Sequence, residues 1–252
     1  MKKFIPLILF FLGITTLTLA FFIIKGKNFK KNDEILEKET SSLKLSPNER
    51  PFVSLIPASD GHYLKMKVER IKFSAESLDY ELLYQVEGGI QQGVPGSVSL
   101  EGKDFFEADL LLGSESSGKF RYDEGVETGT LTLRFRDKNG KLLVKFETEF
   151  HLQASTKLLT SLDGKFKYEL KKKSDGYFVT MNVIGFPSEI QREIVGLKLG
   201  PYGIFSSESE ALPGRVEFDE YGEYFRIDGQ NLVRLEKGES EKLGVFIAVE
   251  SK

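Results

Sequence analysis

The segment LTLRFRDKNGKLLVKFETEFHL, residues 131–152, decides the fold class of this chain. Apolar side chains occupy every second position from 131 to 135, and the same alternation returns from 142 to 152 with Thr148 as its one polar member. Between these arms lies Asp137-Lys138-Asn139-Gly140, in which Asn-Gly accepts the positive φ values of a tight primed turn. Alternation with a period of two places one face of a strand in a core and the other in water. The segment therefore predicts an antiparallel β-hairpin.

The same alternation extends in both directions from this hairpin. It recurs in residues 64–68, 78–86, 106–112, 166–170, 177–183, 195–199, 216–218 and 243–249. Turn sequences such as Gly88-Gly89 and Pro95-Gly96 separate the alternating segments. The 21 Phe and nine Tyr suit pleated sheets. We expect an all-β chain built from antiparallel sheets.

A short polar joint, Gln153–Lys157, divides the β-rich part into halves of about 100 residues each. Strand and turn spacing in each half is typical of a sandwich. We therefore expect two tandem antiparallel β-sandwich (Ig-like) domains, at 51–153 and 157–252. The segments 59–68 and 174–183 are alike and lie 115 residues apart. This likeness favours a tandem duplication, although two strands that meet at a turn also coincide by chance.

The N-terminal segment from Phe4 to Ile24 carries no charge and is flanked by lysines. A helix of this length spans the hydrocarbon core of a bilayer, so we expect a transmembrane helix at 4–24 behind a short cytoplasmic tail at 1–3. A cleaved signal peptide, cut after Ala20, is the alternative. Cleavage there would leave Phe21 to Ile24 at the new terminus, and for this reason we favour a retained anchor.

The orientation of the anchor rests on two opposed indications. The lysines that follow the span outnumber those before it, which by the positive-inside rule favours a cytoplasmic C-terminal part. A lysine pair before an apolar core is instead how export signals begin, and we expect the β-rich part to lie outside the cell. Residues 25–50 are rich in charge and poor in apolar side chains, which predicts a flexible charged stalk.

Composition excludes several functional classes. The formal net charge is −3 with both signs interspersed, which gives no reason to expect nucleic acid as a partner. The absence of Cys excludes disulfides and cysteine-based metal sites or nucleophiles. The two histidines, His62 and His151, have no partner at metal-ligand spacing, and we expect both to be exposed. Most Tyr and Phe occupy buried positions of the alternation, so a carbohydrate-binding aromatic platform is only weakly indicated.

No local motif for a nucleophile, a phosphate or a dinucleotide appears, and we assign no catalytic, cofactor-binding or metal residue. The acidic turns, among them Asp137–Gly140, match no ordered calcium loop. A site assembled from distant strands would leave no local signature. For this reason an enzyme remains the alternative class.

Residues 199–214, LGPYGIFSSESEALPG, lack sustained alternation and contain several Gly and Pro residues. They predict a long loop, and long loops more often carry function than short ones. Tyr202 and Phe205 lie near its start, and we expect them to form a partner-contact patch. The competing interpretation places Ile204 and Phe205 under the edge of the sheet.

Residues 94–152 carry a resemblance to a known group of proteins. This region includes GVPGSVSLEGKDFFEADLLLGS and RYDEGVETGTLTLRFRDKNGKLLVKFETEFHLQ. It resembles an uncharacterised family of small, single-anchor membrane proteins of candidate-phyla (Patescibacteria) bacteria. The likeness covers the first β-domain and the layout of anchor and stalk. It implies a bacterial cell-surface setting and brings no activity or site residues.

Together these observations predict a membrane-anchored cell-surface protein that works as an interaction or structural module. Its expected partners are the membrane, through Phe4–Ile24, and another surface protein or envelope component. The alternative is a hydrolase of envelope polymers with a site assembled from distant strands. A deep pocket lined by converging carboxylates would favour the hydrolase.

Overall fold

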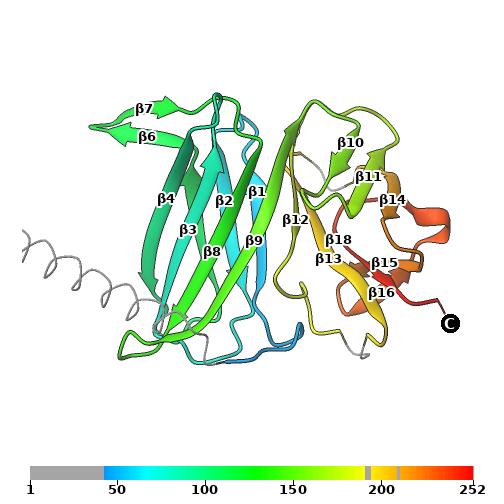
Figure 1. Cartoon of the computed structure of the whole chain (residues 1–252), viewed down its shortest axis with the longest axis horizontal. Helices are drawn as coiled ribbons and strands as arrows, with labels where there is room; N and C mark the ends of the chain where they lie inside the picture. Colours follow the sequence, from blue (N-terminus) through cyan, green and yellow to red (C-terminus); the bar gives the residue numbers. More distant parts are fainter. Residues whose placement is uncertain (1–42, 191–193, 209–210, 252) are drawn as a thin grey trace, which may run out of the picture. The chain divides into compact units, whose positions relative to one another are not determined.

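The computed structural model describes residues 43–190, 194–208 and 211–251. These residues form an all-β, antiparallel structure, which confirms the expected fold class (Figure 1). The strands are β1 (Phe52–Pro57), β2 (Tyr63–Glu69), β3 (Ser77–Gln85), β4 (Gln91–Ser99), β5 (Phe106–Leu111), β6 (Gly113–Ser116), β7 (Lys119–Tyr122), β8 (Thr128–Arg136), β9 (Leu142–Ala154), β10 (Leu158–Thr160), β11 (Phe166–Leu170), β12 (Tyr177–Asn182), β13 (Leu197–Ser206), β14 (Gly214–Phe218), β15 (Glu223–Asp228), β16 (Asn231–Arg234), β17 (Glu239–Ser240) and β18 (Val245–Val249), with a 3₁₀ turn, η2 (Glu236–Gly238), before β17.

One large sheet organises the molecule. It has nine strands in the order β16-β15-β18-β13-β12-β9-β8-β3-β4. A three-stranded sheet, β1-β2-β5, and a four-stranded sheet, β10-β11-β14-β17, supply the remaining layers, and β6 and β7 form a separate hairpin. Figure 1 shows the long strands of the large sheet running side by side through the body.

The large sheet crosses the expected domain boundary, so the expectation of two separate sandwiches is corrected. Strand β9 of the first half pairs with β12 of the second half, from Ala154↔Tyr177 to Phe150↔Met181. Leu43–Lys252 accordingly forms one compact unit. The joint at Gln153–Lys157 is polar because it turns the chain from β9 into β10, not because contacts end there. The similar segments 59–68 and 174–183 also lie in different sheets, with β2 in the three-stranded sheet and β12 in the large one.

Two hydrophobic cores lie on opposite faces of the large sheet. The first core joins this sheet to β1-β2-β5, and the second joins it to β10-β11-β14-β17. Strand β12 contributes to both: Val179 belongs to the first core and Phe178 to the second. Because successive side chains of a strand point to opposite faces, β12 is buried on both sides. Because both faces of β12 are buried, apolar residues also occupy positions that simple alternation would assign to the solvent face.

The hairpin that decides the fold class is present as β8 and β9, but its turn differs from the expected one. Gly140 has a φ of 75°, whereas Asn139 does not have a positive φ. The Gly140 N–H bonds Asp137 O, and the Asp137 carboxylate accepts from the N–H groups of Asn139 and Lys141. This is a type I turn followed by a left-handed glycine, with a register shift after Phe135. The Asp137 side chain stabilises it by satisfying two N–H groups.

The loop expected at 199–214 is mostly a strand. β13 runs from Leu197 to Ser206 and pairs with β12 on one side and β18 on the other. The pairing with β18 shifts register around Gly200-Pro201, so the two breakers sit in a bulge and do not end the strand. Proline is tolerated at such a position because no ladder hydrogen bond is required there.

The last part of the expected stalk packs on the β-rich body. The Leu43 N–H bonds Leu143 O at 2.9 Å, and Leu43 and Leu45 contact the first core. The flexible stalk of residues 25–50 is therefore corrected for residues 43–50. The expected tail, the transmembrane helix and the rest of the stalk lie outside the described residues.

Candidate functional site

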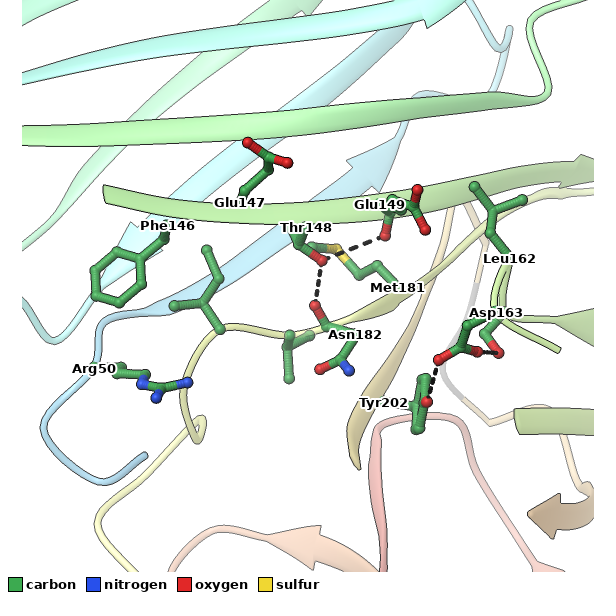
Figure 2. Close-up of a pocket in the computed structure, with 13 residues that line it drawn as sticks. Arg50, Phe146, Glu147, Thr148, Glu149, Leu162, Asp163, Met181, Asn182 and Tyr202 are labelled. Atoms are coloured by element: carbon green, nitrogen blue, oxygen red, sulfur yellow. Dashed lines mark hydrogen bonds between the residues drawn. The ribbon is translucent and has the colours of Figure 1, made fainter. Parts of the chain in front are cut away.

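A cavity of about 430 Å³ opens where β9 and β12 separate (Figure 2). The pairing of these strands ends at Phe150↔Met181. Beyond that point, the Thr148 hydroxyl donates to Asn182 O at 2.5 Å in place of a backbone bond. The lining residues include three carboxylates, Glu147, Glu149 and Asp163. A pocket lined by several carboxylates would favour a hydrolase. Whether this pocket does so depends on how its carboxylates are hydrogen-bonded and ionised.

Asp163 is one of the carboxylates that line this cavity, and both of its carboxylate oxygens already accept hydrogen bonds. It accepts from Ser161 Oγ at 2.6 Å, Tyr202 Oη at 2.5 Å and the Lys165 N–H at 3.0 Å. Desolvation opposes ionisation of Asp163, but the bonds from Ser161, Tyr202 and Lys165 outweigh it and lower the pKa of the carboxyl. Such a carboxylate stays ionised and is unsuited to donating a proton.

The remaining groups of the cavity do not complete a catalytic arrangement. Desolvation and the bond to Asp163 raise the pKa of the Tyr202 hydroxyl. The Tyr202 hydroxyl therefore keeps its proton and donates it to the hydrogen bond with Asp163. Figure 2 shows Glu147 pointing away from the pair of Asp163 and Tyr202, and its carboxylate lies 3.2 Å from Lys145 Nζ. The geometry assigns the pair a structural role in holding the β10–β11 loop against β13.

The partner-contact patch expected at Tyr202 and Phe205 is corrected by their burial. Tyr202 is 1% exposed and belongs to the second core, where its ring stacks on Phe166 at 5.1 Å. Phe205 is half-buried and packs on the first core, with its ring 6.3 Å from that of Phe52. The physical reason is that β13 lies between the two cores, with Tyr202 in the second and Phe205 packed on the first.

The two histidines are half-buried, not exposed as expected. Nδ1 of His151 lies 2.9 Å from Thr160 O and 3.1 Å from Thr160 Oγ1. The His62 ring stacks on Tyr122 at 3.9 Å with an interplanar angle of 8°. Both histidines line a second cavity of about 520 Å³. Among the described residues, no group of three or more His, Asp or Glu is placed to hold a metal ion.

An exposed aromatic surface lies beside this second cavity, on the hairpin of β6 and β7. Figure 1 shows the hairpin projecting from the body. Phe120 is 49% exposed and Tyr122 is 39% exposed. The two rings are parallel within 8°, with centroids 6.2 Å apart, and His62 continues the series. We call Phe120, Tyr122 and His62 the aromatic ladder.

The hairpin has two chemically different faces. Phe120 and Tyr122 lie on one face, and the register places Glu115 opposite Phe120 on that face. Lys119 and Arg121 alternate with them and lie on the other face. The hairpin belongs to neither core. Its aromatic side chains are therefore not required to fill the interior, and large exposed apolar patches often mark interaction sites.

Sequence reasoning missed this site because β7 is only four residues long. An alternation of two apolar and two basic residues is too short to separate a strand from a loop. The signals that were present are the turn at Ser117-Gly118 and the charged alternate positions of KFRY, which are incompatible with a strand buried on both faces. The stacking of His62 depends on a contact across 60 residues of sequence and has no local signal.

Comparison with known proteins gave no match to a family model, to a curated protein or to a solved structure. None of the residues that the structure describes belongs to an apolar helix of membrane-spanning length, and the anchor expected at Phe4–Ile24 falls outside them.

Proposed function

We propose that this chain is a membrane-anchored cell-surface protein that works as an interaction module. In this proposal Phe4–Ile24 holds the protein in a bacterial membrane, and the β-rich body lies outside the cell. The observation that supports a binding role is the aromatic ladder, an exposed aromatic surface on a hairpin that neither core requires. Aromatic side chains dominate binding energies at protein interfaces.

Binding is supported better than the alternative of an envelope-polymer hydrolase. Asp163, one of the three carboxylates of the β9–β12 cavity, is held ionised by its donors, which lower its pKa. A glycosidase of the usual two-carboxylate type needs a carboxylic acid with a raised pKa beside an ionised partner. No such pair is formed by Asp163 and its neighbours.

A binding measurement with isolated envelopes tests the proposed function. The full-length chain, labelled and held in neutral-lipid nanodiscs, would be mixed with envelope fragments from a Patescibacteria-containing culture. We expect saturable binding that falls at least fivefold in the variant Phe120→Ser/Tyr122→Ser. Tyr221→Ser is the matched control, because Tyr221 is 95% exposed and lies in a different turn. Equal binding by the ladder variant and the parent would refute the role of the hairpin.

The proposed orientation is tested separately on intact cells. Protease added outside should remove the β-rich body from cells that express the full chain. Full protection would place this part in the cytoplasm and agree with the literal lysine count.

A further inference from the structure

The aromatic ladder adjoins a cavity with an excess of negative charge. His62 of the ladder lines this cavity together with four carboxylate residues, Asp60, Asp123, Glu124 and Glu127. No Lys or Arg is among the described residues that line it. The whole chain has 35 basic and 38 acidic residues, so the local excess does not follow from composition. It is a property of how the fold brings these segments together.

Two of the four carboxylates are fixed in position by hydrogen bonds. Asp123 Oδ2 accepts from the Tyr84 hydroxyl at 2.8 Å, and Asp60 Oδ1 accepts from the His62 N–H at 3.0 Å. Glu124 and Glu127 are exposed at the rim. Fixed carboxylates lose little freedom when an opposite charge arrives, which makes the cavity pre-organised for a cation.

Negative charge also extends along the ladder itself. Glu115 lies on the aromatic face of the hairpin, opposite Phe120. The pKa of the Tyr63 hydroxyl beside Tyr122 is raised by desolvation and by Tyr122, and the negative charges of Asp60 and Glu115 raise it further. Aromatic faces attract Lys and Arg side chains through the ring quadrupole. Rings and carboxylates therefore favour the same kind of ligand.

We propose that the aromatic ladder and the adjoining acidic cavity bind a segment of the partner protein that carries lysine or arginine side chains. The inference rests on the proposed function and specifies the chemistry of its partner. Aliphatic stems and guanidinium planes pack along the exposed rings, and the cationic groups meet the carboxylates at the rim. A neutral glycan would use the rings but would gain nothing from the charge of four carboxylates.

Fluorescence anisotropy with a defined probe tests this inference. The probe is a labelled peptide with four lysines alternating with glycine, titrated with the full-length chain in neutral-lipid nanodiscs. We expect binding that weakens at least tenfold in Glu124→Gln/Glu127→Gln, and likewise in Phe120→Ser/Tyr122→Ser. Raising the salt concentration from about 50 to about 200 mM should also weaken binding, because exposed charges are screened over a Debye length of about 10 Å at 0.1 M.

The control variant is Glu217→Gln/Glu241→Gln, which removes the same net charge at two exposed residues on other elements. Retained peptide binding by this control supports the inference. Equal loss in control and rim variants would show attraction to net charge alone and overturn it. Ladder-dependent binding of a neutral oligosaccharide without peptide binding would also overturn it. If envelope binding depends on the ladder but the peptide does not bind, the cationic ligand is refuted while the proposed function stands.

Discussion

The Tyr202 hydroxyl donates a 2.5 Å hydrogen bond to Asp163 Oδ2, which joins β13 of the large sheet to the loop between β10 and β11. Tyr202 lies in the nine-stranded sheet and in the second core, and Asp163 lies in the loop that connects two strands of the four-stranded sheet. It therefore couples the four-stranded sheet to the nine-stranded one. We therefore expect substitutions of Tyr202 or Asp163 to change mainly the stability of the fold.

Tyr202→Phe should lower the free energy of unfolding by about 1.5–3 kcal/mol, because it removes a hydrogen bond to a charged group and keeps the buried ring. Chemical denaturation followed by circular dichroism measures the change. Tyr221→Phe, at a residue 95% exposed, should stay within about 0.5 kcal/mol of the parent. A Tyr202→Phe variant as stable as this control would show that the bond contributes nothing.

The lowered pKa of Asp163 predicts how acid affects stability. A carboxyl whose folded pKa lies below its unfolded value, here 3.8, stabilises the fold above that value. This contribution is lost as the pH falls through the folded pKa. The stability difference between the parent and Asp163→Asn should therefore be largest near neutral pH and should narrow below about pH 4.

Melting curves from pH 7 to pH 2 test this dependence, with the exposed Asp104→Asn as control. A difference between parent and Asp163→Asn that stays constant over the whole range would contradict it. So would a difference that widens on acidification, because that sign belongs to a group whose folded pKa is raised.

Most strands could be predicted from the sequence, whereas their arrangement could not. Leu131, Leu133 and Phe135 alternate because they lie on the face of β8 that belongs to the first core, and this pattern is local. The pairing of Ala154 with Tyr177 joins the expected domains and has no local signature. Only the start of β13, up to Leu199, follows from the alternation, because Gly200-Pro201 resembles a loop when the bulge beside β18 is unknown.

The candidate site was predicted less well than the fold. The Gly and Pro residues that flank Tyr202 indicate a surface loop, but β13 buries its side chain in the second core. Phe120 and Tyr122 were overlooked because aromatic residues in alternation are usually core. Their exposure follows from the projection of β6 and β7 beyond both cores, which only the three-dimensional structure reveals.

The segment at 43–50 should stabilise the β-rich body measurably. A fragment of residues 43–252 should fold without the anchor, because both cores lie within it. A fragment of residues 51–252 loses the half-buried side chains of Leu43 and Leu45 and should be less stable by about 1–3 kcal/mol. Urea denaturation of the two fragments measures the difference, and equal midpoints would show that the segment packs without contributing to stability.

Thr180→Val should stabilise the protein. Thr180 is 0% exposed, and its hydroxyl has no hydrogen-bond partner among the residues that the structure describes. An unsatisfied buried polar group costs about 1–3 kcal/mol, and valine has nearly the same shape. We expect a gain of about 1 kcal/mol in the free energy of unfolding.

Thr148→Val is the matched control, because the Thr148 hydroxyl is buried but donates to Asn182 O. This variant should be less stable than the parent. If both substitutions shift stability in the same direction, the difference in hydrogen bonding does not explain their effects.

The two cores should unfold together because β12 belongs to both. Phe178→Ala removes a large side chain from the second core and should cost about 3–5 kcal/mol, and Leu131→Ala in the first core about 2–5 kcal/mol. In a tandem of independent sandwiches, each substitution would lower the stability of its own half alone. In a shared sheet, loss of either core exposes one face of β12 and weakens the pairing of β9 with β12, so both halves lose protection. Amide exchange followed by mass spectrometry, read separately for residues 51–153 and 157–251, distinguishes the two cases. We expect both halves of each variant to exchange in a single cooperative step, and persistent protection of residues 51–153 in Phe178→Ala would show that the shared sheet does not couple the cores.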